Sequence, residues 1–137
     1  MGWSLFCRPR IREKPLSDEQ DKLLQESKQR IISSDEYKIS VFEWENTNHS
    51  GHANTVLFTH GWSGNTLSFS HMIKHLITQG FNVIAFDSLV HGKSSGKTMA
   101  LRNTQAILAI TQHVGSIYVL VGHSLGSMTN AYTINLV

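Results

Sequence analysis

Short apolar runs alternate with amphipathic segments from residue 55 onward, and this alternation restricts the fold more than any other feature of the chain. Three continuous apolar runs have the length and composition of β-strands that are covered on both faces; they lie at 55–58, 83–86 and 117–121. Three segments with helical spacing of apolar residues follow them, at 69–77, at 103–114 and after Gly122. Strands and helices in regular alternation require right-handed crossovers. The sequence therefore predicts an α/β fold with a mostly parallel sheet and helices on both of its faces.

The N-terminal third of the chain has a different pattern. Ser17 and Gln20 fit a capping box, and apolar residues recur about two turns apart as far as Ile32, which predicts a helix over 17–34. From Tyr37 the apolar period changes to two, which is typical of a strand with one exposed face. These changes divide the chain into three parts: an N-terminal tail at 1–16, an N-terminal helix at 17–36 and a partial α/β domain at 37–137.

Composition excludes several classes of protein. The net charge of +2 is too small to indicate nucleic acid as a partner. Cys7 is the single cysteine, so neither an internal disulfide nor a zinc site built from cysteines can form. No apolar run approaches the roughly 20 residues that a membrane-spanning helix needs. We expect a cytoplasmic protein without a transmembrane segment, and its oligomeric state stays open.

The segment Gly122–Gly126 is a G-x-S-x-G pattern with Ser124 at its centre. It directly follows an expected strand and precedes an expected helix, which is the context of a nucleophile elbow. Such a turn forces the serine into strained backbone geometry and leaves room only for small residues at Gly122 and Gly126. In return, the hydroxyl is presented at a helix N-terminus. The alternative is a plain turn in which Ser124 merely caps the helix.

A second glycine motif, His60-Gly61-Trp62-Ser63-Gly64, follows the strand that precedes it. Acyl transfer needs two N–H donors that face the developing oxyanion. We expect one donor to be the backbone N–H of Leu125 and the other that of Trp62, with Gly61 allowing close approach of the backbone. The alternative is a generic glycine turn.

A third motif consists of Asp87 and the segment His91-Gly92-Lys93-Ser94, after the middle strand and on the same rim of the sheet as Ser124. Together, the three motifs resemble those of the α/β-hydrolase superfamily, in the branch of esterases, lipases, thioesterases and serine peptidases. The resemblance covers roughly 41–131 and corresponds to the N-terminal half of such an enzyme. It implies Ser124 as the nucleophile, Trp62 and Leu125 as the oxyanion hole, and a set of residues that shape the site: His60, Gly61, Gly122, His123, Gly126, Asp87 and His91.

The resemblance also implies a catalytic triad in the chain order serine, acid, histidine, and here the sequence departs from the pattern. None of the residues after Ser124 is Asp, Glu or His. Loss of the base alone from a serine hydrolase lowers the rate about 10⁶-fold. We therefore expect the N-terminal half of a serine hydrolase for a small-molecule carboxylic ester, thioester or related acyl substrate, inactive as this fragment and needing no cofactor. The alternative is an inactive truncated product or a non-enzymatic interaction module.

Two other chemistries are weaker candidates. Gly92-Lys93-Ser94 and Gly96-Lys97-Thr98 resemble the end of a phosphate-binding loop, but the glycine required five residues earlier is replaced by Asp87 and His91. His71 and His75 are spaced like metal ligands, but they fall off the apolar face of their helix. Nucleotide binding stays a minor alternative, and no metal site is expected.

Overall fold

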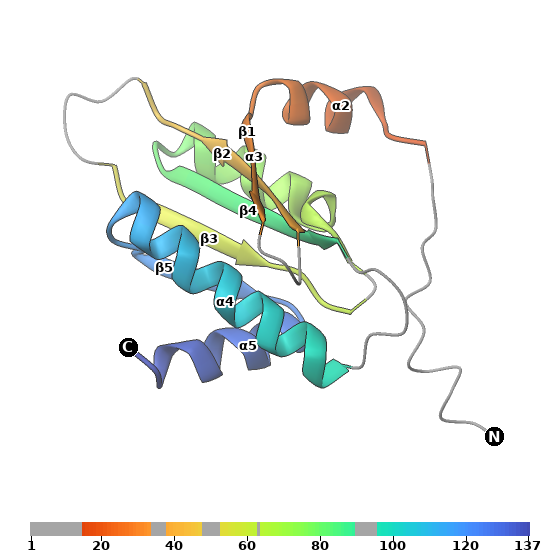
Figure 1. The fold of residues 1–137 in the computed structure, drawn as a ribbon. Helices are drawn as coiled ribbons and strands as arrows, with labels where there is room; N and C mark the ends of the chain where they lie inside the picture. Colours follow the sequence, from red (N-terminus) through yellow and green to blue (C-terminus); the bar gives the residue numbers. More distant parts are fainter. Residues whose placement is uncertain (1–14, 34–37, 48–52, 63, 90–95) are drawn as a thin grey trace.

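The computed structural model describes residues 15–33, 38–47, 53–62, 64–89 and 96–137. Within these residues five strands form one sheet in the order β1-β2-β4-β3-β5 (Figure 1). The strands are β1 Lys28–Ser33, β2 Lys38–Trp44, β3 Thr55–Thr59, β4 Asn82–Leu89 and β5 Val119–Gly122. The helices are α2 Asp18–Gln25, the 3₁₀ helix η1 Thr66–Phe69, α3 Ser70–Thr78, α4 Gly96–Val114 and α5 Leu125–Ile134.

The parallel part of the sheet confirms the predicted alternation. β3 pairs in parallel with β4 on one side and with β5 on the other. The chain passes from β3 to β4 through η1 and α3, and from β4 to β5 through α4. Gly80 (φ 91°) and Gly115 (φ 89°) follow α3 and α4 with the positive φ angles that end a helix. β1 and β2 extend the sheet as antiparallel strands, so the sheet is mixed.

The helix predicted over 17–34 is correct only in its first half. α2 starts at the capping box, in which Ser17 Oγ accepts from the Gln20 N–H at 3.2 Å, and it ends at Gln25. Residues 28–33 form β1 instead, where they pair antiparallel with β2. β-Branched Ile31 and Ile32 fit a pleated strand better than a helix, and pairing with β2 satisfies the backbone of this segment.

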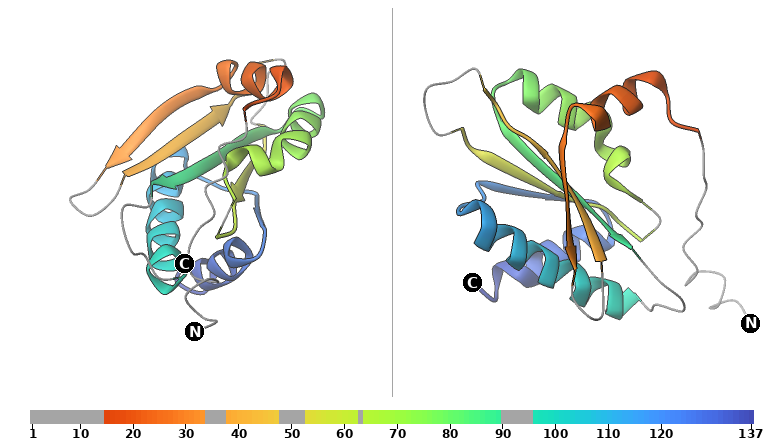
Figure 2. Two further views of the ribbon diagram at one scale, coloured as in Figure 1. Left: turned by 90° about the vertical axis from the view of Figure 1, so that its right-hand side faces the viewer. Right: turned by 45° about the horizontal axis from the view of Figure 1, so that its top comes forward.

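Two apolar cores lie on opposite faces of the sheet, and the alternation of side chains along β3 and β4 supplies both. One core joins the sheet to α2 and α3; it contains Leu23, Trp44, Val56, Phe58, Phe69, Ile73, Val83 and Ala85. The other joins the sheet to α4; it contains Ile39, Val41, Leu57, Ile84, Phe86, Ala106, Ile107 and Ile110. Figure 2 shows α2 and α3 on one side of the sheet and α4 and α5 on the other. The prediction of helices on both faces is therefore confirmed.

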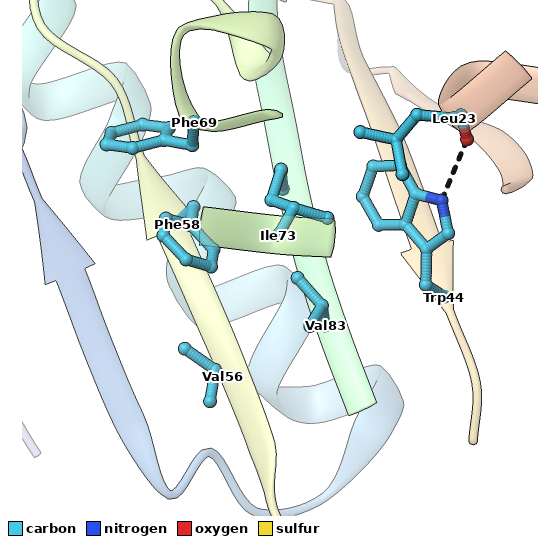
Figure 3. Close-up of a cluster of buried hydrophobic side chains, with 8 residues drawn as sticks. Leu23, Trp44, Val56, Phe58, Phe69, Ile73 and Val83 are labelled. Carbon is cyan, nitrogen blue, oxygen red and sulfur yellow. Dashed lines mark hydrogen bonds between the residues drawn. The ribbon is translucent and has the colours of Figure 1, made fainter. Parts of the chain in front are cut away.

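Tryptophan 44 connects α2 to the sheet. Its indole Nε1 donates a hydrogen bond of 2.9 Å to the Leu23 carbonyl, and both residues are buried (Figure 3). The same core holds the rings of Phe58 and Phe69, whose centroids lie 4.9 Å apart. An indole N–H buried without an acceptor is costly, so this bond allows Trp44 to fill the core beneath α2.

The expectation that β5 is a fully buried strand is wrong for the described chain. β5 lies at the end of the sheet beside β3, and its residues are half-buried or exposed. Val119 is 39% exposed and the preceding Tyr118 is 66% exposed. Only one edge of β5 is paired here, so its outer backbone edge and part of its side chains stay open.

Parallel pairing brings Asp87 and the two glycine motifs together at one rim of the sheet. Thr59, at the end of β3, lies opposite Phe86 of β4 and Gly122 of β5. The residues that follow these positions therefore meet at the carboxyl edge of the sheet. In open α/β sheets this is the edge where ligands bind.

Candidate functional site

Ser124 occupies the sharp turn between β5 and α5. Its backbone has φ 55° and ψ −121°, and it is the one non-glycine residue with a positive φ among those that the structure describes. Its side chain makes no capping hydrogen bond to α5 and is exposed. This argues against the plain capping role and leaves the hydroxyl free at the N-terminus of a helix.

The two glycines that flank Ser124 are required by close backbone contacts. A Cβ on Gly122 would lie 2.6 Å from the Ser127 nitrogen and 2.7 Å from the Gly126 carbonyl carbon. A Cβ on Gly126 would collide with the Thr59 carbonyl oxygen. Both positions therefore have room only for a glycine: at Gly122 the first turns of α5 lie against the end of β5, and at Gly126 α5 packs directly on the end of β3.

The loop after β3 lies against the serine turn. A Cβ on Gly61 would lie 3.1 Å from the His123 carbonyl oxygen and 3.2 Å from Ser124 Cβ, so the two turns touch at Gly61. Among the described residues, the backbone N–H groups of Trp62 and Leu125 have no hydrogen-bond acceptor. Two backbone donors without acceptors thus flank the serine, one on each turn.

A pocket of about 620 Å³ opens beside Ser124. It is lined by His60, Gly61, Trp62, Gly64, Ser68, Phe69, Met72, His123 and Ser124. None of these side chains is a carboxylate or an ammonium or guanidinium group. Phe69, the last residue of η1, and Met72 of α3 were not predicted as pocket residues. Their apolar helical spacing identified them only as core positions.

Asp87 supports the rim from β4. Its Oδ1 accepts from the Thr66 N–H at 2.6 Å and from the Thr66 hydroxyl at 2.8 Å, which holds the start of η1 against β4. The same oxygen lies 3.9 Å from His60 Nε2. The sequence pattern gave no indication of Thr66. His91 lies outside the described residues, and so does the rest of the segment 90–95.

Asn130 is a second residue that the sequence patterns missed. It lies on α5 and is buried, and its Oδ1 accepts from the Thr59 hydroxyl at 2.7 Å. This bond joins the helix that follows Ser124 to the strand that precedes His60. The two motifs are therefore held together from behind as well as at Gly61.

The described ranges contain no group of three or more His, Cys, Asp or Glu side chains that could hold a metal ion. His71 and His75 are both exposed on α3. In the same ranges, no helix has the length and apolar character to cross a membrane.

Comparison with known proteins agrees with this fold. A sequence model of the α/β hydrolase fold matches residues 54–134, which is more than half of the chain. The chain belongs to the α/β-hydrolase fold family. No curated protein sequence matches it significantly.

Solved structures with the same fold include an epoxide hydrolase from Vigna radiata, with a TM-score of 0.60 and 24% identity. The match covers 80% of this chain and 34% of the epoxide hydrolase. A thioesterase domain from the curacin biosynthetic pathway has a TM-score of 0.63 and 24% identity, with 80% of this chain and 40% of that one covered. Epoxide Hydrolase A from Mycobacterium thermoresistibile has a TM-score of 0.61 and 17% identity, with 78% and 34% covered. The chain thus spans about a third to two fifths of the length of these structures.

Proposed function

We propose that this chain carries the nucleophile and the oxyanion hole of a serine hydrolase that acts on carboxylic esters, thioesters or related acyl compounds. The observation that carries the proposal is the backbone of Ser124, held at φ 55° between β5 and α5 with its side chain exposed. A strained serine that caps nothing is costly to a fold and is expected at a reacting centre. The neighbours named epoxide hydrolase and thioesterase are both hydrolases by name.

In the proposed reaction, Ser124 Oγ attacks the acyl carbonyl carbon while its proton passes to a base. The carbonyl electron pair moves to oxygen, and the resulting oxyanion accepts hydrogen bonds from the N–H groups of Trp62 and Leu125. The adduct then collapses, the alcohol or thiol leaves with the proton from the base, and an acyl-serine remains. Water hydrolyses this ester by the same steps and restores the serine.

The residues that follow Ser124 in the 137-residue sequence supply no proton acceptor of the expected kind, because none of them is Asp, Glu or His. His60 is 4% exposed and is occupied by its own contact with Gly61, which makes it unsuited to shuttle a proton to a leaving group. In our proposal the base and the acid come from outside these residues. The chain alone then has an oriented nucleophile without a base.

The lining of the pocket supports a neutral substrate. Trp62, Phe69 and Met72 supply apolar surface, and the polar lining consists of hydroxyl, imidazole and backbone groups. Among the described lining residues, a charged acyl group would be desolvated without an opposite charge. An uncharged acyl group fits this lining better.

A fluorophosphonate probe tests the proposal. We expect slow phosphonylation that mass spectrometry locates at Ser124, that rises with added imidazole as an external base, and that is lost in S124A. Ser127, exposed in the next turn, provides the matched control, since S127A keeps the labelling. Labelling of Ser124 no faster than that of Ser127 would contradict the proposal and favour a non-enzymatic module. Fast labelling that does not depend on imidazole would contradict our inference that the chain lacks a base.

A further inference from the structure

A buried histidine beside the pocket makes a contact that the proposed reaction does not use. His60 directly follows β3, is 4% exposed, and has its ring 6.5 Å from the Phe86 ring, centroid to centroid. Its Nδ1 lies 2.7 Å from the carbonyl oxygen of the next residue, Gly61. Its Nε2 is buried and has no hydrogen-bond partner among the described residues. A buried imidazole with one unsatisfied nitrogen is less favourable than an apolar side chain of similar size.

The contact with Gly61 determines which nitrogen carries the proton. A carbonyl oxygen only accepts hydrogen bonds, so Nδ1 must be the donor. His60 therefore holds a proton on Nδ1, and Nε2 faces the Asp87 carboxylate at 3.9 Å, beyond hydrogen-bond distance. The proton on Nδ1 is a consequence of this geometry and can be detected without any enzymatic assay.

The same contact fixes the orientation of a peptide group. The Gly61 carbonyl accepts from His60 Nδ1 and also from the Gly64 N–H at 3.1 Å. In a planar trans peptide the carbonyl and the following N–H point in opposite directions. The Trp62 N–H is therefore directed away from both donors, and rotation of this peptide would break both bonds.

The histidine ring is itself held from β4. Asp87 Oδ1 accepts two hydrogen bonds from Thr66 and lies next to Nε2, on the side of the ring opposite Nδ1. Asp87 thus occupies the space behind the ring with a carboxylate that Thr66 fixes in place. The ring is confined between the end of β4 and the Gly61 carbonyl.

We propose that His60 is a positioning residue that locks the Gly61–Trp62 peptide, so that the Trp62 N–H is oriented toward the oxyanion before substrate binds. The inference rests on the proposed function, since it assigns a purpose to the Trp62 donor. It differs from a general packing role because it depends on a single N–H group, at Nδ1, and on no other property of the ring. Any side chain that presents a donor at that place should preserve the lock.

Two substitutions distinguish a donor at the place of Nδ1 from a donor at the place of Nε2. The amide nitrogen of asparagine lies near the place of Nδ1, whereas that of glutamine lies near the place of Nε2. H60N should therefore keep the bond to the Gly61 carbonyl, and H60Q should lose it. Both variants are polar and similar in size to histidine, so they form a matched pair.

The first measurement uses the unaltered chain. Nitrogen-15 NMR of the imidazole should report the tautomer protonated at Nδ1, and an Nε2-protonated neutral ring would overturn the inference. The second measurement follows the Trp62 amide in ¹H–¹⁵N spectra, where we expect the H60N signal near that of the unaltered chain and the H60Q signal clearly displaced. Equal displacement in both variants would show a packing role only.

The third measurement is the rate of imidazole-assisted phosphonylation at Ser124. We expect H60N within about threefold of the unaltered chain and H60Q slower by roughly 10²-fold, the size of effect seen when an oxyanion donor is lost. If H60Q and H60N label equally fast, the lock has no role in the reaction. If Ser124 is not labelled even in the unaltered chain, the proposed function fails, while the tautomer and amide measurements still decide whether the lock exists.

Discussion

The Cα of Gly126, in the first turn of α5, lies so close to the carbonyl oxygen of Thr59 that a methyl group between them would collide with backbone. Backbone atoms cannot move aside as a flexible side chain can. This contact sets how near the helix behind Ser124 approaches the end of β3, and therefore how near the serine lies to the loop at Gly61.

Replacement of Gly126 by alanine should be strongly destabilising. We expect G126A to lower the free energy of unfolding by about 3 kcal/mol or more, since the added Cβ overlaps the Thr59 and His60 carbonyls. Urea denaturation followed by circular dichroism measures the change. G115A is the control: Gly115 has a positive φ of 89°, but a Cβ there meets nothing within 4 Å, so only the backbone cost of about 1–2 kcal/mol applies. Equal losses in the two variants would contradict the close packing of α5 on β3.

The backbone of Ser124 predicts an unusual order of stabilities. S124A retains the positive φ angle with a Cβ, whereas S124G relieves it. After the larger entropy loss of glycine is subtracted, S124G should be more stable than S124A by about 1 kcal/mol. Inside a helix, without a positive φ angle, alanine would be the more stable residue by about 0.5–1 kcal/mol. The two urea midpoints provide the test, and a more stable S124A would indicate that the turn is not strained.

The buried hydrogen bond between Thr59 and Asn130 should contribute to the coupling of β3 with α5. T59V keeps the shape of the side chain but removes the donor, which leaves the Asn130 Oδ1 unsatisfied, at a cost of about 1–3 kcal/mol. T111V is matched in chemistry, because the Thr111 hydroxyl donates to Ile107 O within its own helix; we expect a change within about 0.5 kcal/mol. Thermal or urea unfolding compares them. If T59V loses no more unfolding free energy than T111V, the Thr59–Asn130 bond does not contribute to stability.

The open edge of β5 should promote self-association of the 137-residue chain. Val119 is 39% exposed on this strand and lines an apolar groove with Tyr118 and Met72. A lysine at an edge position discourages pairing with a second strand, so V119K should shift the chain toward monomer in light scattering at equal concentration. Q105K adds the same charge at an exposed site on α4 and should leave the association unchanged. If both variants disperse the chain equally, net charge and not the strand edge is responsible.

The amino-terminal elements show where sequence reasoning failed. The capping box correctly located the start of α2, because that bond involves residues three positions apart. The pattern did not reveal that 28–33 leaves the helix, since Ile31 and Ile32 fit either period over so short a stretch. The antiparallel pairing with the neighbouring strand β2 decides that this segment is a strand. Likewise, β5 has the apolar composition of a covered strand, and its exposure depends on which strands stand beside it.

The sequence by itself determined the alternation of strand and helix from Thr55 onward and the glycines that the turn at Ser124 requires, and it indicated the serine that we propose as the nucleophile. These are local properties, set by apolar period and by the backbone freedom of glycine. Only the tertiary structure decided that Gly61 touches the serine turn, that Thr66 and Asn130 hold the two motifs in place, and that His60 carries its proton on Nδ1. Each of these depends on distances of a few ångströms between segments far apart in the chain, and no pattern of residue types encodes such distances.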